Sequence, residues 1–129
     1  MIKIEKISKI FRTEEVETKA LSEVSITINQ GEFVTIMGAS GSGKSTLLNI
    51  VGLLDGATNG SYQLLNQEMI GVKEQEKSKI RKQNIGFIFQ NFNLIDELSV
   101  FDNIELPLIY NDVPSSERKK KVEAIAERL

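Results

Sequence analysis

Residues 38–45 constrain this chain more than any other stretch, because they read Gly-Ala-Ser-Gly-Ser-Gly-Lys-Ser. They match the pattern G-x-x-x-x-G-K-[ST], in which a glycine-rich loop directs backbone N–H groups at phosphate oxygens. Glycine is needed there because a Cβ would block the close approach of the backbone. The motif predicts a nucleotide phosphate site whose cradle is formed by Gly38, Ser40, Gly41, Ser42 and Gly43.

Three side chains after the glycines are expected to complete this site. Lys44 reaches the β- and γ-phosphates, and Ser45 places its hydroxyl on Mg²⁺. Thr46 follows in a helix whose N-terminus adds partial positive charge. The alternative is a glycine- and serine-rich turn that matches by accident. The context favours the site, because residues 32–37 predict a buried strand and residues 47–51 a buried helix, the setting that the motif requires.

Composition excludes several classes of function. The 129 residues, 40% hydrophobic and 26% charged, suffice for one globular domain at most. A net charge of −2 gives no overall basic field, so nucleic acid is not expected as a partner. Cysteine and histidine are absent from the sequence, which excludes thiolate and imidazole catalysis. No stretch approaches about 18 uninterrupted apolar residues, so any membrane association is expected to need a partner.

The first part of the chain predicts antiparallel strands. Residues 2–5 and 24–28 alternate apolar and polar side chains, as half-buried strands do. Residues 12–15 are mostly charged and predict an exposed hairpin tip. The Asn59-Gly60 dipeptide predicts a turn before a short strand at residues 62–65.

Two predicted elements lie between the phosphate motif and a second apolar run. The helix after the loop is expected to bury one face against a sheet. Residues 72–84 are nearly all charged and polar, and they predict a solvated helix rather than a nucleic-acid patch. The face expected to be buried in the first helix consists of Leu47, Leu48, Val51 and Leu54, with Ile50 beside it.

Residues 85–89 form a second near-continuous apolar run, typical of a strand covered on both faces. Gln90 follows at its carboxyl end, where α/β sheets hold their ligands. From these residues alone, Gln90 is either a site residue or a simple strand terminus.

Two helices are predicted in the last third. Ser99 is expected to cap a helix that starts at Val100, and Pro107 to kink or end it within about a turn. A final helix is expected to open at residues 114–117 and to run to the end of the chain, which is therefore interpreted as a cut. Its predicted apolar face consists of Val122, Ile125, Ala126 and Leu129.

These motifs together resemble the ATP-binding subunits of ABC transporters, and most closely the branch associated with macrolide export, lipoprotein release and antimicrobial-peptide resistance. The resemblance covers essentially the whole chain and rests on residues 38–46, 85–94 and 102–108. It implies an α/β fold of the P-loop NTPase class with a RecA-like core, present as an incomplete domain. The parts are a mainly antiparallel β-region (1–37), a core from the P-loop to the Q-loop (38–90) and the beginning of a helical subdomain (91–129).

The resemblance also implies roles for individual residues. Phe11 matches the aromatic residue that stacks on adenine, although a buried core phenylalanine is the competing interpretation. Gln90 matches the glutamine that senses Mg²⁺ and the γ-phosphate, and is expected to act in catalysis together with Lys44. The implied cofactors are ATP and Mg²⁺, with Ser45 and Gln90 at the metal.

The implied partners are a transmembrane permease, contacted through the region after Gln90, and a second ATP-binding subunit. The protein is then cytoplasmic and peripheral on the inner face of the cell membrane. The family's Ser-Gly-Gly signature, Mg²⁺-supporting aspartate, catalytic glutamate and γ-phosphate-sensing histidine are not found in residues 1–129, nor is the strand that neighbours the phosphate-loop strand. We therefore expect weak MgATP binding and no turnover by this chain alone.

Two alternatives stay open from the sequence. A truncated, non-catalytic module could occupy a membrane partner without hydrolysing ATP. Another phosphate-loop enzyme, such as a small GTPase or a nucleotide kinase, is less favoured because its loop usually lies close to the N-terminus.

Overall fold

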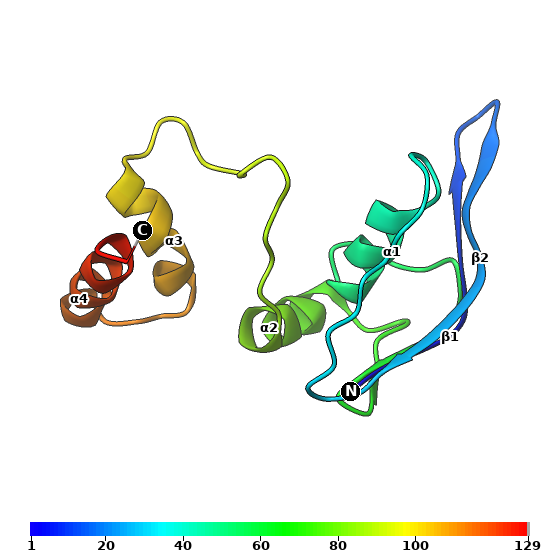
Figure 1. The fold of residues 1–129 in the computed structure, drawn as a ribbon, viewed down its shortest axis with the longest axis horizontal. Coiled ribbons are helices and arrows are strands. Elements are labelled where there is room, and N and C mark those ends of the chain that lie inside the picture. Colours follow the sequence, from blue (N-terminus) through cyan, green and yellow to red (C-terminus); the bar gives the residue numbers. More distant parts are fainter. Residues whose placement is uncertain (129) are drawn as a thin grey trace. The chain divides into compact units, whose positions relative to one another are not determined.

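A computed structural model describes residues 1–128, which fold into two units, residues 1–86 and residues 87–128 (Figure 1). The first unit contains a four-stranded antiparallel sheet in the order β2-β1-β3-β4. Its elements are β1 (Ile2–Arg12), β2 (Glu17–Ile28), α1 (Lys44–Val51), β3 (Asn59–Leu64), β4 (Gln67–Glu68) and α2 (Glu74–Asn84). The predicted antiparallel region and its exposed hairpin tip are confirmed.

One apolar core joins the sheet to α1. Side chains from β1, β2 and β3 pack against the buried face of α1 and against the turn that follows it. Tyr62 of β3 is fully buried, and its hydroxyl donates a hydrogen bond to the Val51 carbonyl at 2.6 Å. The core residues are Ile4, Ile7, Leu21, Leu47, Ile50, Leu53, Tyr62, Leu64 and Met69.

The predicted buried face of α1 is only partly correct. Leu47 and Ile50 are buried and Val51 is half-buried, but Leu48 is 49% exposed. Leu54 is 44% exposed because α1 ends at Val51, so helical spacing no longer applies beyond it. The solvated helix expected at residues 72–84 is confirmed as α2, which carries no fully buried residue.

The predicted turn at Asn59-Gly60 is wrong, because both residues belong to β3. Gly60 adopts φ +104°, and a Cβ placed on it would lie 2.6 Å from the Lys6 carbonyl oxygen of β1. The pairing of β1 with β3 shifts register between Glu5 and Ser8. Glycine at position 60 therefore serves a close approach of two strands at an irregular point of the sheet.

The two apolar runs predicted as buried strands do not form strands here. Residues 32–37 carry no strand, and Phe33 is 95% exposed. Residues 85–89 carry none either, and Ile88 is fully exposed. An apolar run becomes a strand only when another strand supplies its backbone hydrogen bonds. The four-stranded sheet of residues 1–128 pairs with neither run.

The second unit contains the helices α3 (Val100–Tyr110) and α4 (Ser115–Ala126). The predicted cap is confirmed: the Ser99 hydroxyl accepts a hydrogen bond from the Asp102 N–H at 3.1 Å, within a capping box. The predicted effect of Pro107 is also confirmed, since α3 ends at Tyr110, within a turn of the proline.

The prediction for the last helix is partly wrong. α4 ends at Ala126 rather than running to the end of the chain, and Ala126 itself is exposed. Val122 is buried as expected, but Ile125 is 45% exposed. Leu129 lies outside the described residues. α4 is joined to α3 by an ion pair between Arg118 Nε and Glu105 Oε1 at 2.8 Å.

Candidate functional site

The glycine motif forms a tight loop that leads directly into α1. Gly41 and Gly43 adopt φ values of +77° and +88°, a region that residues with a Cβ rarely enter. The Ser42 N–H donates to the Ala39 carbonyl at 3.3 Å, which closes a turn within the loop. The glycine-dependent loop and the helix after it thus form as predicted, but residues 32–37, which lead into the loop, do not form the predicted strand.

The loop is held against the sheet at Gly43, the N-cap of α1. A Cβ on Gly43 would lie 2.5 Å from the Ala20 carbonyl oxygen and 2.9 Å from Leu21 Cδ2, both in β2. Such distances leave no space for any other residue. The contact fixes where the N-terminus of α1 begins relative to the β1–β2 hairpin.

Lys44 is folded back onto the loop. Its Nζ donates hydrogen bonds to the carbonyl oxygens of Gly38 at 2.9 Å and Ala39 at 2.6 Å, and lies 3.4 Å from Ser42 Oγ. These acceptors are neutral, so a phosphate oxygen would offer the ammonium a stronger, charge-assisted hydrogen bond. The Lys44 ammonium therefore lies close to the loop, where it could form a hydrogen bond with an anion bound there.

Ser45 and Thr46 occupy the first turn of α1. Ser45 is exposed and Thr46 is half-buried. The first turn of α1 contains no acidic residue, so no carboxylate competes for the partial positive charge of the helix N-terminus. The Ser45 hydroxyl is an oxygen donor of the kind that Mg²⁺ accepts.

Phe11 lies at the end of β1, opposite Thr18 of β2. Its side chain is 45% exposed, so the interpretation as a buried core phenylalanine is wrong. Ala20, which contacts Gly43, follows Thr18 closely along β2. The β1–β2 hairpin therefore carries the ring and also contacts the glycine loop at Gly43, and contact of the ring with adenine stays a prediction.

Gln90 belongs to the second unit and is exposed. It does not end a strand, because residues 85–89 form none. The stacked rings of Phe87 and Phe89, whose centroids are 5.1 Å apart, precede it. The role of Gln90 at Mg²⁺ and the γ-phosphate stays a prediction.

Lys9, which lies beside Phe11, and its partner Asp55 were not predicted from the sequence as residues near this site. The Lys9 Nζ lies 2.7 Å from Asp55 Oδ1 and 4.9 Å from the centroid of the Phe11 ring. The available signal was the spacing of Lys9 and Phe11, because side chains two residues apart share one face of a strand. Asp55 lies in a segment rich in turn-forming residues, and no functional motif in that segment indicated a role for it.

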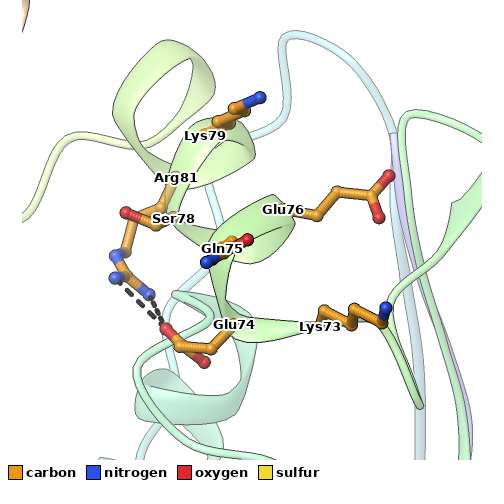
Figure 2. A pocket seen from close by; sticks show the side chains of 7 residues that line it. All are labelled: Lys73, Glu74, Gln75, Glu76, Ser78, Lys79 and Arg81. Atoms are coloured by element: carbon orange, nitrogen blue, oxygen red, sulfur yellow. Dashed lines mark hydrogen bonds and ion pairs between the residues drawn. The ribbon is translucent and has the colours of Figure 1, made fainter.

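A separate surface hollow follows the exposed side of α2 (Figure 2). Its side chains are of mixed charge, and Arg81 is directed at Glu74, 3.4 Å away, and at the Leu53 carbonyl oxygen, 2.5 Å away. The hollow is a solvated helix face with an arginine that ties α2 to the turn after α1. Its lining residues are Lys73, Glu74, Gln75, Glu76, Ser78, Lys79 and Arg81.

Comparison with known proteins decides the family. The family described as ABC transporter matches residues 21–129. The chain belongs to the ABC transporter family. This membership confirms the predicted resemblance. Within residues 1–128, no helix is both long and apolar enough to cross a membrane.

Several relatives from the ABC transporter family align with this chain over all or most of its length. It is 40% identical over 129 residues to the uncharacterized ABC transporter ATP-binding protein YvrO of Bacillus subtilis (strain 168), covering 56% of that protein. It is 48% identical over 119 residues to the macrolide export ATP-binding/permease protein MacB of Chlorobaculum tepidum, covering 92% of this chain and 18% of MacB. It is 40% identical to MacB of Azoarcus sp. (strain BH72), covering 20% of that protein. The chain thus spans about half the length of its shorter curated relatives and a fifth of MacB.

Solved structures of an ABC cassette share the fold. The dimeric post-hydrolysis state of the ATP-binding cassette MJ0796, bound to ADP and Pi, superposes with a TM-score of 0.88 at 42% identity, over 96% of this chain and 55% of that one. A second dimeric structure of MJ0796 gives a TM-score of 0.85 at 44% identity, over 93% of this chain and 53% of that one. The predicted α/β P-loop NTPase class is confirmed for this ABC-family chain.

Proposed function

We propose that residues 38–46 bind the phosphates of MgATP, and that the protein powers an ABC transporter which exports or extracts its substrate. The observation that carries this proposal is the loop itself. It is a positive-φ glycine loop braced on β2 by Gly43, with the Lys44 ammonium held by two neutral carbonyl oxygens. Both features suit an anion that approaches the N-terminus of α1.

The chain's own groups perform most of the binding. Backbone N–H groups of the loop donate to phosphate oxygens, and Lys44 exchanges its carbonyl acceptors for an anionic one. In the proposed reaction Lys44 stabilises the negative charge that spreads over the γ-phosphoryl group. Ser45 and Gln90 would hold Mg²⁺, which when bound neutralises charge on the β- and γ-phosphates. Phe11 would stack on the adenine.

The partners of the whole protein are proposed by analogy with its relatives. The MacB relatives are named ATP-binding/permease proteins, and MJ0796 is described as a dimeric cassette. We propose a transmembrane permease that contacts the region after Gln90, and a second ATP-binding subunit that completes each site. The protein would then work in the cytoplasm, on the inner face of the cell membrane.

Hydrolysis is proposed to need groups that residues 1–129 do not contain, namely the general base and the signature motif of a second subunit. The 129-residue chain by itself is therefore expected to bind MgATP weakly and to show negligible turnover. Steady hydrolysis at rates typical of ATP-driven transporters would contradict this expectation.

The test is calorimetric titration of the purified chain with MgATP and, for comparison, MgGTP. Lys44→Ala should weaken ATP binding by about tenfold or more, because it removes a charge-assisted hydrogen bond to phosphate. Lys73→Ala is the matched control, because Lys73 is an exposed lysine of the same unit. Equal binding by wild type and Lys44→Ala, or clear selectivity for GTP, would overturn the proposal.

A further inference from the structure

Lys9 of β1 is held more firmly than a surface lysine. Its Nζ donates to Asp55 Oδ1 and to the Gly56 carbonyl oxygen, both at 2.7 Å, and its side chain is only 13% exposed. The same strand is fastened to the same segment by backbone contacts. The Thr58 N–H donates to the Ser8 carbonyl at 2.8 Å. The ammonium thus has a fixed position between β1 and the segment that follows α1.

The Asp55 carboxyl is stabilised in its charged form, which binds the Lys9 ammonium. Burial raises the pKa of its carboxyl, but hydrogen bonds from the Lys9 ammonium and the Gly56 N–H, with nearby positive charge, lower the pKa below its usual value overall. Asp55 therefore stays ionised at neutral pH. An ionised partner keeps Lys9 in one rotamer, where an unpaired lysine would sample many.

The fixed ammonium lies over one face of the Phe11 ring, 4.9 Å from its centroid. This distance is within the range of a cation–π contact, which draws the ring and the charge together. The ring is nevertheless 45% exposed. Lys9 thus covers one face of Phe11, and the exposed area is available to a flat ligand.

The hairpin that carries the Phe11 ring also contacts the glycine loop, the proposed phosphate site. Phe11 pairs with Thr18, and β2 continues to Ala20, whose carbonyl oxygen packs against Gly43. One hairpin therefore carries the ring and also contacts the start of α1. A nucleotide whose phosphates occupy the loop, and whose base extends toward β2, would bring the base next to this hairpin.

We propose that Lys9, fixed by Asp55, is a positioning residue that holds the Phe11 ring for stacking on the purine of the bound nucleotide. This inference rests on the proposed function. A cation on one face draws π-electron density toward itself, so the opposite face repels the electron-rich purine less. A ring already held in one orientation also loses less entropy when the base binds.

The test measures two ligands on the natural full-length protein: MgATP, which has a base, and magnesium tripolyphosphate, which has none. Lys9→Met keeps the length of the side chain but removes its charge. It should weaken ATP binding by about two- to fivefold, the range for an exposed cation–π contact, and leave tripolyphosphate binding unchanged. Lys9→Arg should retain most of the ATP affinity, because guanidinium also stacks on aromatic rings.

The matched control is Lys3→Met, which removes a lysine of the same strand whose pair with Glu5 is exposed. It should change neither affinity. Lys9→Met should have no further effect on ATP binding in a Phe11→Ala background, because Lys9 acts through the ring. If Lys9→Met does not fold, Asp55→Asn is the variant to test in its place. It too should weaken ATP binding and leave tripolyphosphate binding unchanged.

The outcomes separate this inference from the proposed function. Equal loss of ATP and tripolyphosphate affinity in Lys9→Met would overturn it, since the lysine would then only support the fold. Unchanged ATP affinity in Phe11→Ala or Lys9→Met would also overturn it, although the phosphate site would stand. Failure of the wild type to bind either ligand would instead overturn the proposed function and this inference with it.

Discussion

The Tyr62 hydroxyl donates a hydrogen bond to the Val51 carbonyl oxygen at 2.6 Å and so ties β3 to the last residue of α1. Burial raises the pKa of Tyr62 to about 12. The phenol therefore keeps its proton, and with it the hydrogen bond, at every physiological pH. This bond anchors the far end of α1 to the sheet, and α1 is the helix whose N-terminus carries the proposed phosphate site.

We expect Tyr62→Phe to lower the free energy of unfolding by about 1 kcal/mol, because it deletes this hydrogen bond and keeps the ring. Urea denaturation at neutral pH would measure the change. Tyr110→Phe is the control and should cost less than about 0.5 kcal/mol, because that side chain is 69% exposed. Equal stability of Tyr62→Phe and wild type would show that the bond contributes nothing.

Gly60→Ala is expected to destabilise the first unit by about 1–3 kcal/mol or more, the usual cost of backbone strain, with a steric clash added. The new Cβ would lie 2.6 Å from the Lys6 carbonyl oxygen, and φ is +104°. Gly71→Ala separates the two effects, because Gly71 also has a positive φ but no atom within 4 Å of its Cβ position. A cost no larger at position 60 than at position 71, in the same denaturation assay, would rule out the clash.

Most local signals in the sequence predicted local structure correctly, although the turn expected at Asn59-Gly60 proved to be part of β3. The charged hairpin tip, the glycine loop and the Ser99 cap each depend on residues within a few positions, and each was found. These features are stabilised by turn-forming residues and short-range hydrogen bonds, and the residues that provide both can be read from the local sequence.

Features that depend on a distant partner were predicted poorly. The apolar runs at 32–37 and 85–89 have strand-like composition, but a strand also needs a neighbour, and composition does not say whether one is present. The contact of Lys9 with Asp55 joins positions 46 residues apart, and nothing local to either residue indicates it. The glycine loop was thus predictable from the sequence, whereas the contact of Lys9 with Asp55 needed the structure.

The Glu105–Arg118 pair is expected to hold α3 and α4 together. Its atoms are 2.8 Å apart, the side chains are only 17% and 23% exposed, and Arg118 also donates to the Val113 carbonyl. Glu105→Gln should destabilise the helix pair by about 1–1.5 kcal/mol, because the amide keeps an acceptor oxygen but loses the charge that strengthens the hydrogen bond. Hydrogen exchange of the α3 and α4 amides would report this loss locally.

The control for this helix pair is Lys121→Met, which breaks an exposed i,i+4 pair with Glu117 at 3.7 Å. Such exposed pairs are worth about 0–1 kcal/mol and weaken in salt. Equal effects of Glu105→Gln and Lys121→Met on amide exchange would show that burial adds nothing to the Glu105–Arg118 pair.

Glu68 gives the sheet a dependence on acid. Burial raises the pKa of its carboxyl, but hydrogen bonds from the Ser61 hydroxyl and from the N–H groups of Ile70, Tyr62 and Met69 lower the pKa below its usual value overall. A carboxyl with a lowered pKa in the folded state stabilises the fold fully above the ordinary glutamate pKa of 4.5, and loses that contribution as pH falls further. Glu68→Gln should therefore be less stable than wild type at pH 7, and the difference in stability should shrink in acid.

Urea denaturation between about pH 3 and pH 7 would measure this difference. Glu17→Gln is the control, because Glu17 forms an exposed pair with Arg12. If the stability difference between Glu68→Gln and wild type stays constant across this pH range, the charge of Glu68 does not stabilise the contact between β3 and β4.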